Sequence, residues 1–182
     1  IIIKNMFVQL DRDYLTSELR ADNDEQDVDV TDLGEISLSH RKIASINRDT
    51  FQGLNRLTRV NLSHNTIENL EAGVFDALRN LTDLILYDNL VVKIDAGLFP
   101  STLMNLRNVD FDENQIGTIE PKAFRYLINL NEIRLGSNRL DQLDSTTFDG
   151  LRNLSVVHLN SNQLRTIDEG LFRGLINLTR VD

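Results

Sequence analysis

Hydrophobic residues recur along this chain at a nearly constant spacing. From Leu33 onward the pattern L-x-x-L-x-L-x-x-N-x-L returns every 24 residues, with one interval of 25 and other apolar residues at some leucine positions. The alternation within L-x-x-L-x-L predicts a short strand in each copy, whose positions 4 and 6 face a core while positions 3, 5 and 7 face outward. A period of this length indicates a solenoid in which every copy forms one turn. The copies span 33–56, 57–80, 81–105, 106–129, 130–153, 154–177 and, in part, 178–182.

Two further apolar columns run through the copies. Six of the eight phenylalanines stand at the nineteenth position, which predicts a row of buried rings: Phe51, Phe75, Phe99, Phe124, Phe148 and Phe172. The fourteenth position is always aliphatic, and we expect it to face the core as well: Ile46, Leu70, Ile94, Ile119, Leu143 and Ile167.

An asparagine follows the strand in every complete copy except the first: Asn65, Asn89, Asn114, Asn138 and Asn162. The chain turns there and leaves backbone groups that must be paired if they are buried. Because an amide side chain donates and accepts at once, these residues predict an internal hydrogen-bonded ladder with a structural role. Arg41 replaces the asparagine in the first copy, and its long cation suits a terminal turn that still meets solvent.

At these residues the sequence resembles the typical 24-residue class of leucine-rich repeat. That class occurs in Toll-like receptor ectodomains and in many secreted or cell-surface proteins of adhesion and innate immunity. The resemblance covers residues 33–182. It implies an α/β repeat solenoid, a horseshoe with a parallel sheet on the concave face and a mostly irregular convex side. It also implies a recognition module that works outside the cell.

Residues 1–32 precede the repeats, and a solenoid needs polar terminal units to cover its core. We therefore expect a cap or leader segment at 1–32 and a repeat domain at 33–182. The apolar start should pack on the first repeat or on a partner, and the acidic stretch from Ala21 to Asp29 should form a solvated loop. At the other end, Val181 and Asp182 fall within a strand, which leads us to expect that the fold continues.

Pro100, Ser101 and Thr102 lie in the one copy that is a residue longer than the others. Insertions in solenoids map to loops on one face. We therefore expect a local bulge on the convex side, with the row of strands undisturbed.

Net charge and cysteine content bear on habitat and partners. A charge of -9 favours a protein partner with a polar or basic surface and disfavours nucleic acid and anionic membranes. No apolar run is long enough to insert in a membrane. Extracellular relatives usually seal their ends with disulfides, yet this chain has no cysteine. Four N-x-S/T sequons nevertheless favour an extracellular location, although N-L-S/T is also common at repeat boundaries: Asn61, Asn80, Asn153 and Asn177.

The catalytic parts needed for an enzyme do not come together in this pattern. His158 and Asp182 share an outward position on neighbouring turns, but no positioned nucleophile accompanies them. His40 and His64 share another position without a third metal ligand. Calcium at Asp110 and its neighbours is disfavoured because alternate side chains on a strand stand too far apart to converge. We expect no catalysis, no cofactor and no metal ion.

The outward positions of the third, fourth and fifth copies form the candidate binding surface. Six carboxylates lie on these adjacent turns with a single cation, and an aromatic and an aliphatic side chain border them. Such anchors beside charge are typical of interface hot spots, although a merely solvated acidic face remains an alternative. A structural subunit that docks through its chain ends to form an oligomer is the alternative function. The predicted partner-binding residues are Asp83, Ile85, Tyr87, Asp88, Asp110, Asp112, Glu113, Glu132 and Arg134.

Overall fold

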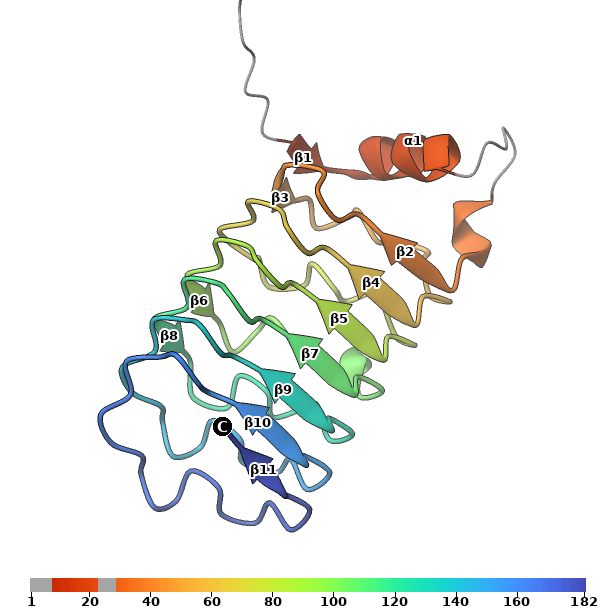
Figure 1. Ribbon diagram of the computed structural model, residues 1–182. Coiled ribbons are helices and arrows are strands. Elements are labelled where there is room, and N and C mark those ends of the chain that lie inside the picture. Colours follow the sequence, from red (N-terminus) through yellow and green to blue (C-terminus); the bar gives the residue numbers. More distant parts are fainter. Residues whose placement is uncertain (1–7, 23–28) are drawn as a thin grey trace, which may run out of the picture.

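Each copy of the repeat forms one turn of a solenoid, and its strand joins a parallel sheet along one face (Figure 1). The computed structural model describes residues 8–22 and 29–182. The expected packing of Ile1 to Phe7 and the loop expected over 23–28 therefore lie outside the described residues. The predicted repeat solenoid with a parallel sheet on its concave face is confirmed.

The main sheet has seven strands, each from one copy and each paired in parallel with its neighbours in the order β11-β10-β9-β7-β5-β4-β2. Equivalent residues face each other along the whole row, as in the pairs Glu35 with Arg59 and Arg59 with Asp83. Positions 3, 5, 7 and 8 of the turns consequently line up as four rows on the outer surface. The strands are β2 (Glu35–Ser37), β4 (Arg59–Asn61), β5 (Asp83–Ile85), β7 (Asn108–Asp110), β9 (Glu132–Arg134), β10 (Val156–His158) and β11 (Arg180–Val181).

The convex side carries little regular structure. Two short strands pair there in parallel, β6 (Lys93–Ile94) and β8 (Thr118–Ile119). The extra residue of the third copy lies in a single turn of 3-10 helix, η2 (Ser101–Leu103), outside the sheet. Strands β5 and β7 remain in register, with Asp83 opposite Asn108. The predicted bulge with an undisturbed row of strands is confirmed.

The phenylalanine column forms the centre of the core. Five of its six rings are fully buried, and Phe172 is partly buried. Ring centroids of Phe99 and Phe124 lie 5.6 Å apart, and those of Phe124 and Phe148 lie 6.2 Å apart. At the fourteenth position, the aliphatic residues of the first four copies are buried, Leu143 is half-buried and Ile167 is 49% exposed.

The asparagine ladder is present as predicted. The amide nitrogen of Asn138 donates to the carbonyls of Phe111 at 2.9 Å and Leu135 at 3.2 Å. Its Oδ1 accepts the backbone N–H of Ile116 at 2.9 Å. The same arrangement recurs at the other four positions, so each turn is bonded to the one before it: Asn65, Asn89, Asn114 and Asn162.

A strand and a helix cover the first turn. Strand β1 (Val8–Leu10) pairs in parallel with β3 (Ile43–Ile46), and helix α1 (Arg12–Asp22) follows it. Leu15 and Leu19 are buried and lie one helical turn apart, so they share the face that covers the core. A 3-10 turn, η1 (Val30–Asp32), then leads into the first repeat.

Helix α1 corrects one prediction about this segment. Ala21 and Asp22 belong to the helix and not to a loop, because the Leu15 and Leu19 face holds the segment against the first turn. Arg41, which replaces the ladder asparagine, pairs with Glu18 of the helix at 2.8 Å. The expectation that Arg41 belongs to the capped end of the solenoid is therefore confirmed.

Candidate functional site

The predicted binding residues lie on strands β5, β7 and β9 and on the turns that follow them, on the concave side of the sheet (Figure 1). Their side chains are half-buried or exposed, whereas Leu84, Val109 and Ile133 between them point into the core. The structure thus brings the nine residues onto one surface, which we call the acidic surface.

Two of its carboxylates are engaged by neighbours. Asp83 accepts hydrogen bonds from the Asn108 amide at 2.8 Å and the Thr82 hydroxyl at 2.7 Å. Glu132 pairs with Arg134 of the same strand at 2.7 Å and lies 3.4 Å from His158 of the next strand. Arg134, the single cation among the six carboxylates, therefore forms its ion pair with Glu132.

Asp110 and Asp112 are held differently. Asp110 accepts the backbone N–H of Asp112 at 3.0 Å, and Asp112 accepts that of Gly136 at 2.6 Å. Neither forms an ion pair with any residue in the described part of the chain. Burial raises the pKa of both carboxyl groups, and the charges of Glu132 and Glu113 act in the same direction. Arg134 acts in the opposite direction on the pKa of both groups, without forming an ion pair with either.

Tyr87 is fixed beside them by two contacts. Its ring meets that of His64 edge-on with centroids 5.2 Å apart, and its hydroxyl donates a hydrogen bond to Glu113 that raises the tyrosine pKa. His64 in turn bonds to Asp88 at 2.7 Å. The aromatic side chain is half-buried, so part of it lies open on the acidic surface.

In the described residues the histidines contact neighbouring side chains and belong to no group that could hold a metal ion. His40 stacks on His64 at 4.2 Å, and within 8–22 and 29–182 no three His, Asp or Glu side chains could together hold a metal ion. His158 does lie 2.9 Å from Asp182, as its position suggested. No hydroxyl of a described residue bonds to this pair, so it resembles the surface ion pair between Arg180 and Asp182 beside it.

The four sequons divide into two groups. Asn61 lies on the concave sheet and accepts the backbone N–H of Ser63 at 3.0 Å. The others stand where the strands begin, and their amide nitrogens donate to backbone carbonyls of the preceding turn, from Asn80 at 2.7 Å, Asn153 at 2.9 Å and Asn177 at 2.8 Å. Asn105 and Asn129 do the same. Sequence reasoning missed this second ladder, although asparagine directly before the first leucine of five successive copies could have revealed it.

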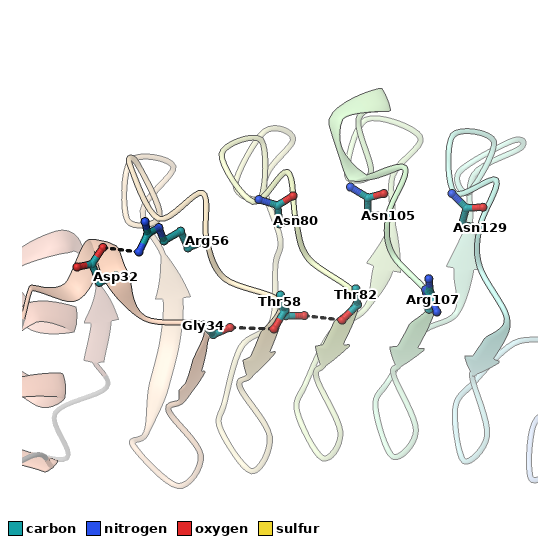
Figure 2. A pocket seen from close by; sticks show the side chains of 9 residues that line it. All are labelled: Asp32, Gly34, Arg56, Thr58, Asn80, Thr82, Asn105, Arg107 and Asn129. Carbon is teal, nitrogen blue, oxygen red and sulfur yellow. Dashed lines mark hydrogen bonds and ion pairs between the residues drawn. The ribbon is translucent and has the colours of Figure 1, made fainter.

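A groove follows this edge of the sheet (Figure 2). The asparagines of the second ladder line one wall, and the second residue of each copy, such as Thr58, Thr82 and Arg107, lines the other. Two adjacent open cavities of about 710 Å³ and about 600 Å³ share Arg107 and Asn129, and we call the two together the edge groove. No sequence prediction pointed to this groove.

None of the described helices is long and apolar enough to cross a membrane. No curated protein matches the sequence at a significant level. Among solved structures, TLR13 in its complex with ssRNA13 superposes with a TM-score of 0.74 and 27% identity, over 81% of this chain and 21% of that one. A leucine-rich-repeat protein of Leptospira interrogans superposes with a TM-score of 0.73 and 25% identity, over 83% of this chain and 36% of that one.

The chain thus spans well under half the length of either protein. The family model for the leucine-rich repeat matches three consecutive stretches, 31–91, 79–135 and 128–182, which together take in every copy found in the sequence. The chain therefore belongs to the leucine-rich-repeat family.

Proposed function

We propose that the chain is a non-catalytic recognition module that binds a protein with a polar or basic surface through its concave face. The observation that carries this proposal is the pair Asp110 and Asp112, half-buried beside the ring of Tyr87 and in no ion pair with a described residue. A lysine or arginine of a partner would relieve the like-charge repulsion, and Tyr87 and Ile85 would supply apolar contact.

The arrangement also supports different contributions to binding from different parts of the acidic surface. Asp88 and Glu113 are exposed at the rim, where charges mainly steer association. Tyr87 lies next to the half-buried aspartates, where desolvated contacts contribute most to the lifetime of a complex. A merely solvated acidic face would not need an aromatic ring clamped between a histidine and a glutamate.

The neighbours in the family support an extracellular or endosomal setting for this module, and the sequons are compatible with it. TLR13 was solved with a single-stranded RNA, but the acidic surface of this chain is unsuited to phosphate. We therefore extend the proposal to a protein ligand and not to nucleic acid.

The proposal is tested by comparing which proteins the parent chain and its variants capture. The parent chain, Tyr87→Ala and a matched control, Tyr126→Ala, are immobilised and exposed to the same extracellular extract. Tyr126 is 38% exposed and lies outside the sheet, so its loss should change nothing. We expect at least one protein to be retained by the parent and the control but not by Tyr87→Ala, and its purified form to bind more weakly by over about 1 kcal/mol.

If every captured protein binds Tyr87→Ala as well as it binds the parent chain, the concave-face proposal is wrong. Light scattering of the parent chain alone addresses the alternative of an assembly subunit. A stable oligomer that Tyr87→Ala leaves intact would favour docking through other surfaces.

A further inference from the structure

The edge groove is a second surface with its own chemistry, independent of the acidic surface. Figure 2 shows Asn80, Asn105 and Asn129 in a row along one wall, facing Thr58, Thr82 and Arg107 on the other. Neighbouring turns are about 4.8 Å apart, so the lining repeats at that interval along the groove.

The polar atoms of the lining are fixed by the fold. Each wall asparagine donates one amide hydrogen to a backbone carbonyl of the preceding turn, as Asn105 does to Arg79 at 2.9 Å. On the opposite wall the Thr58 hydroxyl donates backward to the Gly34 carbonyl at 3.0 Å. The single hydroxyl hydrogen of Thr82 is shared between the Asp83 carboxylate at 2.7 Å and the Thr58 carbonyl at 2.9 Å. Because these side chains are ordered before any ligand arrives, binding loses little further entropy.

This bonding pattern leaves both acceptors and donors free. The carbonyl oxygens of Asn80 and Asn105 accept no hydrogen bond from a described residue, and the second amide hydrogen of each bonds to no described residue either. A lining of this kind fits a ligand whose groups both donate and accept. Hydroxyl groups repeated along an extended chain meet that need, whereas the phosphates of a nucleic acid only accept.

Arg107 interrupts the wall at the middle of the groove. It occupies the position held by Thr58 and Thr82 in earlier turns, and it lines both cavities. Its side chain is exposed, and its guanidinium has no acidic partner in the described chain, whereas Arg56 at the groove's end pairs with Asp32 at 2.8 Å. A guanidinium is a donor-only group that binds carboxylate or sulfate through parallel hydrogen bonds.

From these features we propose that the edge groove binds an acidic oligosaccharide, whose hydroxyls bond to the asparagine and threonine walls and whose anionic group pairs with Arg107. Single-stranded RNA is the other extended ligand to consider. It would need several unpaired cations and stacking aromatic rings, and the lining supplies one free arginine and no aromatic residue.

The test uses two hexasaccharides that differ in charge. Hyaluronan hexamer carries a carboxylate on alternate sugars, and chitohexaose carries the hydroxyls and acetamides without it. The full chain is produced in a bacterial host so that the sequon asparagines bear no glycans. Titration followed by backbone amide NMR shifts should place both ligands on the groove residues, with hyaluronan binding about tenfold more tightly.

Arg107→Gln should remove that preference and leave chitohexaose binding unchanged, because the backbone bonds of Arg107 do not involve its side chain. Arg139→Gln, which removes an exposed arginine that lines a different cavity, should behave as the parent. Tyr87→Ala should also leave both affinities unchanged, which separates this site from the proposed concave one.

Three results would overturn the proposal. The first is that neither sugar shifts groove resonances at millimolar concentration. The second is that Arg139→Gln weakens hyaluronan as much as Arg107→Gln does, which would mean unspecific charge attraction. The third is that an RNA hexamer shifts the groove resonances and the sugars do not.

Discussion

Asp112 accepts the backbone N–H of Gly136, one turn further along the solenoid, at 2.6 Å. An asparagine carbonyl could accept the same bond, so the charge at this position is not needed to hold the turns together. Asp110 also accepts a backbone N–H, that of Asp112 two residues further on in the same turn. Replacing these aspartates by asparagine should therefore remove the charge of the acidic surface and keep its backbone hydrogen bonds. The effect of the charge can then be measured by itself.

Replacing Asp110 and Asp112 together by asparagine should raise the melting temperature at pH 7. Burial raises both pKa values above their unfolded values, so these groups favour the folded state below the ordinary aspartate pKa and lose that contribution as pH rises through the raised values. The gain should therefore shrink as pH is lowered toward about 4. Melting followed by circular dichroism across this pH range measures it.

Asp144→Asn is the control for that experiment, because hydrogen bonds from the side chain and backbone N–H of Thr146 lower the pKa of Asp144. Its contribution is present above the ordinary aspartate pKa and is lost as pH falls through the lowered value. Asp144→Asn should therefore reduce the melting temperature slightly at pH 7. A rise for this variant, or a fall for the double variant, would contradict the electrostatic account.

The same double variant bears on recognition. With a concave-face partner in hand, loss of the two charges should slow association and flatten its dependence on ionic strength, with a smaller effect on dissociation. Surface plasmon resonance at several salt concentrations separates the two rates. An unchanged association rate would mean that Asp110 and Asp112 do not steer the partner.

Phe124→Ala should cost about 3–5 kcal/mol, because the ring is fully buried between two others of its column. Phe172→Ala should cost less, since that ring is only partly buried and its recorded ring contact is with Phe148 alone in the described chain. Urea unfolding followed by circular dichroism compares the two. Equal losses would show that the column does not set the stability of the core.

Asn138→Ala should also be strongly destabilising. It would leave the buried N–H of Ile116 without its partner, at a cost of about 1–3 kcal/mol, and the carbonyl of Phe111 would keep only the amide of Asn114. Asn162→Ala should be milder because its side chain is less buried and water can replace it. Hydrogen exchange at the Ile116 amide reports the loss directly, and unchanged protection there would refute the ladder's role.

Sequence periodicity predicted the sheet, the phenylalanine column and the first asparagine ladder because one geometry repeats in every copy. Helix α1 escaped prediction because it occurs once, so no repetition amplifies its pattern. The pairing of Arg134 with Glu132 and not with an aspartate depends on a choice of rotamer that spacing cannot reveal. The edge groove arises from side chains of adjacent turns, and Arg107 stands out only once its neighbours are seen.

The short helix η2 has a consequence for how such a chain can change over time. One additional residue at Ser101–Leu103 leaves Asp83 opposite Asn108, so a length change on the convex side keeps the strand register. One residue added inside a strand would instead reverse which side chains face outward. Insertions of one residue are therefore expected to be tolerated in the convex turns and not in the strands.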